Sequence, residues 1–103
     1  CRDFFAHKPG AAVAVARRAG NVASVDVLNK YFTLAQMPVV SSSYWNVVFG
    51  QTPDEVMRDL EGLQILRNLG RNMAWLMKCI EAGRAQGVLA PEREHGAVTN
   101  FIR

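Results

Sequence analysis

Two short apolar runs and two longer stretches of helical periodicity organise this chain. Residues 11–16 (AAVAVA) are apolar at every position, which is typical of a strand buried on both faces of a parallel sheet. So short a run can also be helical, but the Pro9-Gly10 turn before it and the RRAG sequence after it favour a strand. The second run begins with a proline that would end any preceding helix. We therefore expect strands at Ala11–Ala16 and at Pro38–Val40.

A helix is expected between these strands. Its apolar positions recur at helical spacing, Ser24 and Asp26 suit its first turn, and it should stop before Pro38. The apolar positions are Val25, Leu28, Phe32 and Ala35. Residues 11–40 therefore form one βαβ unit, whose crossover should be right-handed. Between the first strand and the helix we expect a loop made of Arg17, Arg18, Ala19, Gly20 and Asn21.

A second, longer helix is predicted to begin at Thr52 and to end near Gln86. Thr52 can cap it, Pro53 suits its first position, Glu55 can complete a capping box, and Gly87 can stop it. Its apolar face changes direction along the way. One direction holds Val56, Leu60 and Leu63, and the other holds Leu66, Leu69, Met73, Leu76, Met77 and Ile80. We therefore expect a kink near Glu61 to Gln64, where Gly62 lowers its cost.

A half-polar strip lies beside the main apolar stripe of this helix. It is made of Ile65, Asn68, Asn72, Trp75 and Cys79. Such a strip indicates either wider burial of the helix or a contact between subunits, because tryptophan on a mixed surface is a common interface anchor. Residues 88–103 are expected to form an extended tail, broken by Pro91, whose Phe101-Ile102 pair can dock at its end.

The segment from Met37 to Asn46 carries the strongest functional signal. Three small hydroxyl residues and two large aromatics follow the second predicted strand: Ser41, Ser42, Ser43, Tyr44 and Trp45. Open α/β proteins bind ligands at the carboxyl ends of their strands, so we expect these residues at a ligand-binding edge. The alternative is a strand end whose aromatics cap the core. Residues 31–53 carry no charge, but their polar residues and prolines argue against a membrane-spanning helix.

Composition excludes several classes of protein. A chain of 103 residues makes one small domain, and with half its residues apolar it is not disordered. The formal charge of +3 is too mild to argue for nucleic acid, and the helix-face row Arg67, Arg71 and Lys78 is typical of a solvated surface. Two cysteines form neither a disulfide framework nor a metal spacing, which favours a reduced, cytoplasmic setting without a metal.

Several segments resemble the flavodoxin-like NADPH-dependent FMN reductases, including the multimeric flavodoxin type. The segments that carry the resemblance are Lys8–Val13, Ala16–Gly20, Leu28–Phe32, Gln36–Ser42, Tyr44–Asn46, Thr52–Val56, Gly70–Ala74 and Thr99–Arg103. They cover nearly the whole chain but only the carboxyl half of a family member. The two strands would then be the fourth and fifth of a five-stranded sheet, within a partial three-layer flavodoxin-like α/β fold.

The resemblance also implies a function. Family members bind the FMN phosphate in a loop after the first strand, which lies outside this sequence. Two remaining loops, Arg17–Asn21 and Ser41–Asn46, lie near the flavin ring in the family, and Arg17 or Arg18 could stabilise a reduced flavin unless both simply face solvent. The parent enzyme would take hydride from NAD(P)H onto FMN and pass electrons on. This chain alone is expected to be inactive.

A non-catalytic oligomerisation domain is the competing interpretation. The Ala11–Ala16 strand would leave an apolar edge without the charges or prolines that normally protect one. A two-stranded sheet is also marginal by itself. We therefore expect a homo-oligomer, or association with the missing amino-terminal half, through this edge, the Trp75 strip, or both.

Overall fold

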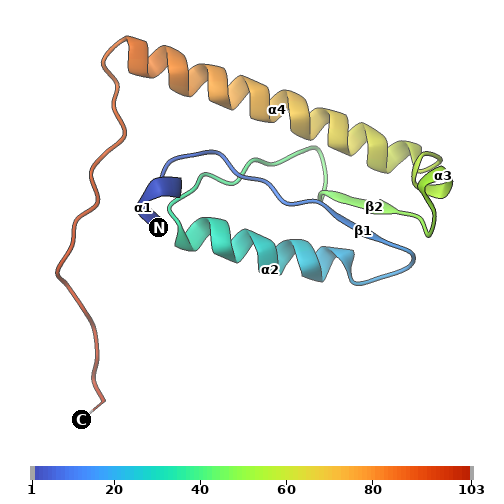
Figure 1. The fold of residues 1–103 in the computed structure, drawn as a ribbon, viewed down its shortest axis with the longest axis horizontal. Helices are drawn as coiled ribbons and strands as arrows, with labels where there is room; N and C mark the ends of the chain where they lie inside the picture. The colour runs from blue at the N-terminus through green and yellow to red at the C-terminus, as the bar shows by residue number, and fades with distance from the viewer. Residues whose placement is uncertain (1, 103) are drawn as a thin grey trace.

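The fold is a mixed arrangement of helices and two short parallel strands. The computed structural model describes residues 2–102, except for the side chain of Arg2. Its elements in chain order are α1 (Arg2–Phe5), β1 (Ala14–Ala16), α2 (Asn21–Leu34), β2 (Val47–Phe49), α3 (Pro53–Val56) and α4 (Leu60–Ala85) (Figure 1). Within this described part, no helix is both long and apolar enough to cross a membrane.

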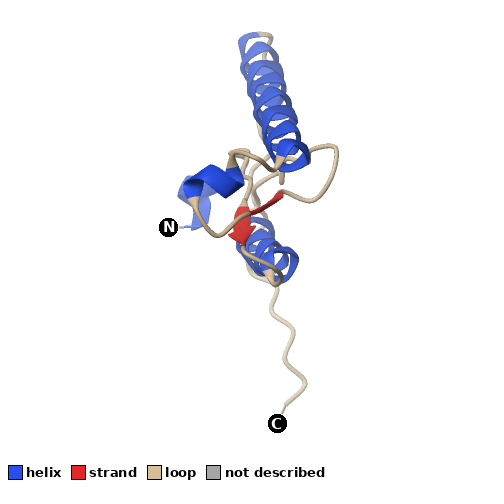
Figure 2. Cartoon of the chain, turned by 90° about the vertical axis from the view of Figure 1, so that its right-hand side faces the viewer, coloured by secondary structure: helices blue, strands red, loops and turns tan. Residues whose placement is uncertain are grey.

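The sheet lies between two helices, which makes three layers. β1 and β2 pair in parallel, with Ala14 opposite Val47 and Ala16 opposite Phe49. Helix α2 packs on one face of both strands, and α4 packs on the other face, over β2 (Figures 1 and 2). The expected βαβ unit with parallel strands, followed by a long helix, is confirmed.

The second strand is not where the apolar run predicted it. Val39 only forms an isolated bridge with Gly10, supported by hydrogen bonds from Gly10 N–H to Pro38 O (2.9 Å) and from Val40 N–H to Gly10 O (2.9 Å). The chain then leaves the ladder over residues 41–46 and returns as β2. The prediction placed the strand at the first apolar run, which ends where the serines begin. The strand that pairs with β1 instead lies in the second apolar run, beyond the serines.

The first strand is shorter and less covered than predicted. A Cβ added at Gly10 would lie 2.9 Å from the Met37 side chain and 3.2 Å from the Phe32 ring, so the even-numbered residues face α2. Val13 and Val15 face the other way, and Val15 is 56% exposed. Burial on both faces was predicted, and it fails because α4 covers β2 rather than β1.

The apolar core is small and surrounds β2. Its buried members are Ala12, Val25, Val40, Val47, Val48, Ile65 and Leu69, with Val48 fully enclosed. The molecule is only 21 Å thick along its shortest axis. Its radius of gyration is 17.4 Å, against about 13 Å for a compact domain of this length. The extended tail contributes to this difference, and large apolar side chains of the body, such as Val15, Tyr31 and Trp75, are also exposed.

Helix α2 starts earlier than predicted. Gly20 takes the left-handed conformation (φ 94°) at its N-cap, and Asn21 is its first residue rather than the last residue of the loop. Asn21 is buried, and its Nδ2 donates to Val48 O at 3.4 Å. The side chain therefore ties the start of α2 to the centre of β2. The helix ends at Leu34, before Pro38 as expected.

The beginning and end of the long helical region follow the sequence signals. Glu55 N–H donates to Thr52 Oγ1 (3.2 Å) and Pro53 is the first helical residue, although the Glu55 carboxylate accepts from Gln51 N–H rather than from Thr52. At the far end Gly87 has φ 87°, and Val88 N–H donates to Gly83 O at 2.8 Å. The predicted cap and stop are both confirmed.

The break in the helical region lies before the predicted kink. Helix α3 ends at Val56 and α4 begins at Leu60, so the chain turns at residues 57–59 and α4 then runs without interruption to Ala85. Asp59 makes this turn, because one carboxylate oxygen accepts from Gly62 N–H (2.9 Å) and the other from Phe49 N–H (2.8 Å). Gly62 therefore makes room for the carboxylate instead of bending the helix; a Cβ there would lie 2.5 Å from Asp59 Oδ2.

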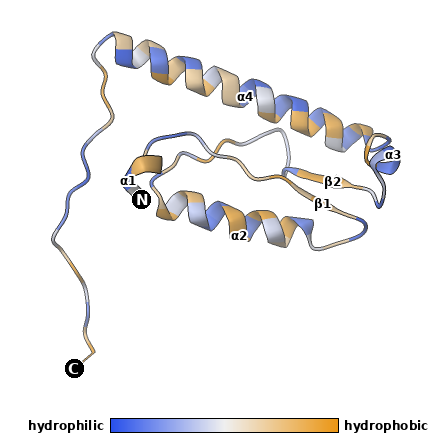
Figure 3. Ribbon diagram, viewed as in Figure 1, coloured by the Kyte–Doolittle hydropathy of each residue, from blue (hydrophilic) through white to orange (hydrophobic). Residues whose placement is uncertain are grey.

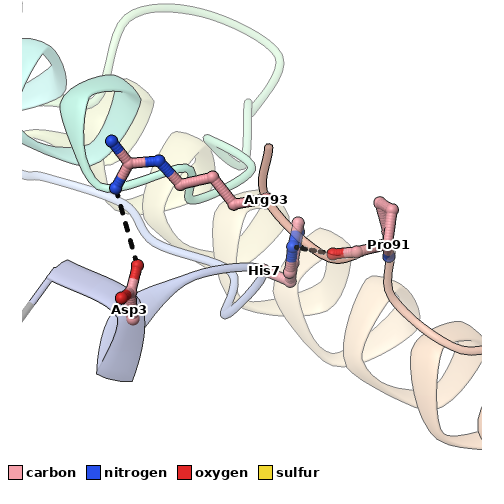
Figure 4. Close-up of polar contacts among 4 residues, drawn as sticks. All are labelled: Asp3, His7, Pro91 and Arg93. Atoms are coloured by element: carbon pink, nitrogen blue, oxygen red, sulfur yellow. Dashed lines mark hydrogen bonds and ion pairs between the residues drawn. The ribbon is translucent and has the colours of Figure 1, made fainter. Parts of the chain in front are cut away.

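The tail runs extended from Gly87, as predicted, and is held to the body at its root. His7 Nε2–H donates to Pro91 O (3.2 Å), and Arg93 pairs with Asp3 at 3.6 Å (Figure 4). Beyond this point the tail leaves the body (Figure 1). Phe101 and Ile102 are almost fully exposed, so the expectation that they dock is wrong.

Replacing Asp59 by alanine should destabilise the fold by about 1–2 kcal/mol, because two backbone N–H groups lose their partner and α4 loses its cap. The midpoint of urea unfolding, followed by circular dichroism, measures this loss. Asp54→Ala is the matched control, since the Asp54 side chain forms no hydrogen bond or ion pair to residues 2–102. Equal midpoints for the two variants would contradict the role assigned to Asp59.

Candidate functional site

An open hollow of about 410 Å³ lies between α2 and the segment that leaves the sheet. This volume is within the range of about 300–1,000 Å³ that is usual for small-molecule sites. Its walls are Val25 and Asn29 of α2 and the chain residues Val39, Val40, Ser41, Ser42, Ser43, Tyr44, Trp45 and Asn46. We call residues 41–45 the serine loop. Every residue predicted after the second strand thus lines one hollow.

The serine loop is fixed by hydrogen bonds to α4. Ser42 Oγ donates to Ile65 O (2.6 Å), Asn68 Nδ2 donates to Ser43 Oγ (3.1 Å), and Asn72 Nδ2 donates to Ser41 O (2.8 Å). The three helix residues follow one another at spacings of three and four, so they share a face of α4. The half-polar strip seen in the sequence therefore binds the loop along its first part. Trp75 and Cys79, further along the same strip, remain exposed.

Asn46 closes the gap that the loop leaves in the sheet. Its Nδ2 donates to Ala12 O (3.0 Å), and its backbone oxygen accepts from Ala14 N–H (3.1 Å). The side chain is therefore held in one orientation, and the residue is only 7% exposed. A single asparagine thus restores the pairing at the point where the second strand is interrupted.

Two amide oxygens at this hollow lack a hydrogen-bond partner. They are the buried Oδ1 atoms of Asn29 and Asn46, and neither is bonded to any of the described residues 2–102. An unpaired buried acceptor costs about 1–3 kcal/mol. Both oxygens are shielded from solvent, so a ligand in the hollow could pair with them only after neighbouring side chains move aside.

Tyr44 and Trp45 form the aromatic part of the wall. Their ring centroids are 4.9 Å apart with the planes tilted by 50°, and both rings are more than half exposed. The alternative that they cap the core is therefore wrong. Exposed aromatic faces beside small hydroxyl residues suit a flat, partly polar ligand.

The two loops predicted at the flavin ring lie at opposite ends of the sheet. Arg17, Arg18, Ala19 and Gly20 follow the carboxyl end of β1, whereas the serine loop precedes β2. Because the strands are parallel, the serine loop lies at their amino ends, and the expectation of Tyr44 and Trp45 at the carboxyl end is wrong. Asn21 belongs to α2 and contacts β2 instead.

The groups available at the hollow are hydroxyls, amides and aromatic rings. Its lining carries no charged side chain, and the described chain contains no group of three histidine, cysteine or acidic residues placed to hold a metal ion. Asn29 was missed in the sequence, and Asn46 was included in the segment Met37 to Asn46 without a role of its own. Asn29 lies four residues after Val25, on the same helix face, and Asn46 separates two apolar runs. Both are therefore polar residues at positions where the pattern predicts burial, which could have identified them.

The change Asn46→Ala should destabilise the protein by about 1–3 kcal/mol, because it removes the buried donor to Ala12 O. Urea unfolding measures this effect. Asn68→Ala is the control: it also removes an amide that bonds in this region, but its bond to Ser43 is exposed, so we expect a loss of about 0.5 kcal/mol. A smaller loss for Asn46→Ala than for Asn68→Ala would contradict the closing role of Asn46.

Comparison of the chain with protein-family models, with curated proteins and with solved structures gave no match. The resemblance carried by segments such as Gln36–Ser42 and Thr52–Val56 therefore stays a prediction.

Proposed function

We propose that the chain contributes one wall of the flavin-ring site of an FMN-dependent NAD(P)H oxidoreductase. The observation that carries this proposal is the hollow itself, where the exposed Tyr44–Trp45 pair and two unpaired amide oxygens occur together. The layered arrangement of α2, two parallel strands and α4 is compatible with the carboxyl part of a flavodoxin-like domain. The resemblance of the sequence supplies the identity of the ligand.

The residues of the hollow fit the ring of FMN. An isoalloxazine ring is flat and aromatic, so it can stack on Trp45 or Tyr44. It also carries an N–H donor, from which the Oδ1 of Asn29 or Asn46 could accept a hydrogen bond once the side chains that cover that oxygen move aside. The serine loop adds backbone and hydroxyl groups around the rim, and its attachment to α4 keeps the wall in place.

The hollow does not fit the phosphate of FMN. Its lining is uncharged, and Arg17 and Arg18 lie at the other end of the sheet, so neither arginine takes part in this proposed site. A phosphate needs several backbone N–H groups or cations. In this proposal the phosphate is bound by the loop that the resemblance places outside this sequence.

The chain's residues would orient the ring and limit its access to water. FMN, when bound, supplies the hydride and electron chemistry between NAD(P)H and an acceptor. Tyr44 and Trp45 would cover part of one ring face, while Asn29 and Asn46 would fix the position of its polar edge. The buried Val25 and Val40 form the apolar floor on which these groups rest.

A non-catalytic assembly domain is the second candidate function. It is favoured by the uncovered side of β1, where Val13 and Val15 are exposed, and by the exposed Trp75 on α4. Exposed apolar groups of this kind mark contact surfaces. Titration of the purified protein with riboflavin separates the two functions, because an assembly domain alone binds no flavin.

Riboflavin and FMN are expected to bind this chain with similar, weak affinities, with dissociation constants above about 100 μM, because only the ring is contacted. The change Trp45→Ala should weaken binding about three- to tenfold through loss of stacking. Trp75→Ala is the control, because that ring lies outside the hollow. Anisotropy of flavin fluorescence during titration with protein gives all these constants.

Three results would contradict the proposal. The first is the absence of riboflavin binding at the highest protein concentration. The second is an equal affinity of the wild type and Trp45→Ala. The third is binding of FMN about 100-fold tighter than riboflavin, because it would require a phosphate site within this chain.

A further inference from the structure

Helix α2 is apolar on both of its faces, and only one face is covered. Val25 and Phe32 point towards the sheet. The opposite, outer face exposes three large apolar side chains, of Val27, Tyr31 and Leu34, whereas Leu28 is exposed on the flank beside Phe32. Figure 3 shows hydrophobic bands recurring along this helix, with hydrophilic bands between them.

The spacing of these side chains indicates a contact between helices. Val27, Tyr31 and Leu34 are four and three residues apart, so they form a continuous seam along the helix. An apolar stripe on a helix normally packs against another element. The structure leaves this seam in solvent, which means that the outer face of α2 lacks a partner within residues 2–102.

The charges beside the seam indicate what that partner is. Asp26 and Lys30 are the only charged residues of α2, and they lie on the same flank, about 40° apart around the axis. Neither forms an ion pair with the described residues of its own chain. If two copies of α2 meet antiparallel about a two-fold axis near Leu28, Asp26 of each copy faces Lys30 of the other. The face is therefore complementary to itself in charge as well as apolar.

We propose that the outer face of α2 is the contact of an antiparallel, two-fold symmetric dimer of this chain. Two-fold contacts use the same patch on both copies, which the pairing of Asp26 with Lys30 satisfies. The proposal does not rest on the flavin site, because Val25 and Asn29, which line the hollow, lie on the other side of the helix. Nor does it use the β1 edge or the Trp75 strip.

The dimer should be weak when α2 is the only contact. A helix of 14 residues is about 21 Å long, and a single helix pair buries less than the roughly 1,200 Å² of a stable interface. We therefore expect a dissociation constant in the range of about 1–100 μM. Sedimentation equilibrium of the wild-type chain, over about 1–300 μM, measures it.

A pair of matched variants tests which face is used. Tyr31 on α2 and Trp75 on α4 are both helical aromatics, 65% and 67% exposed. The change Tyr31→Lys should weaken dimerisation about 100-fold by placing a charge in the seam, whereas Trp75→Lys should leave it unchanged. Circular dichroism melts show whether both variants fold. A wild type that stays monomeric throughout, or a dimer lost in Trp75→Lys and kept in Tyr31→Lys, would overturn the proposal.

Charge reversal tests the antiparallel orientation with exposed side chains that do not affect the core. Each single change, Asp26→Lys or Lys30→Asp, places like charges opposite each other at both ends of the contact and should weaken the dimer about tenfold at low salt. The double change Asp26→Lys with Lys30→Asp should restore it. The antiparallel contact would be overturned if the double variant dimerised no better than the single variants. It would also be overturned if the single variants dimerised as tightly as the wild type.

Discussion

This structure depends on an interruption of its second strand. The chain leaves the sheet over residues 41–46, and other hydrogen bonds replace the pairing that is lost there. Backbone groups that leave a ladder must find other partners if they are buried. Here Asn46 returns a donor to Ala12 O, and three bonds join the serine loop to α4. Without this second set of bonds, β2 could not come back into register with β1, and α4 would lose its contact with the loop.

The same constraint explains why local sequence signals predicted some elements well and others poorly. The Thr52 cap and the Gly87 stop depend on residues within one helical turn, so they could be identified directly. The position of β2 depends on Asn46, Asn68 and Asn72, whose partners lie far away in sequence. No periodicity within residues 38–49 reports such bonds, and the strand was placed at the first apolar run instead.

The sequence also did not show which apolar surfaces of the sheet are covered by helices. The run AAVAVA indicates a strand with two apolar faces, and both faces are indeed apolar, but which one is covered depends on where α4 crosses the sheet. The candidate site shows the same division. The composition of the serine loop suggested hydroxyls and aromatic rings at a ligand-binding edge, as one of two alternatives, but it placed them at the wrong end of the strands. Its separation from Arg17 and Arg18 follows only from the interrupted strand.

The attachment of the serine loop to one face of α4 has a mechanical consequence. Sliding the helix past the loop would break three hydrogen bonds on neighbouring turns together, so the position of the serine loop is coupled to that of α4. The same face continues to the exposed Trp75 and Cys79, about one and two turns beyond Asn72. A contact made at Trp75 or Cys79 would therefore act on the same helix that holds the wall of the hollow.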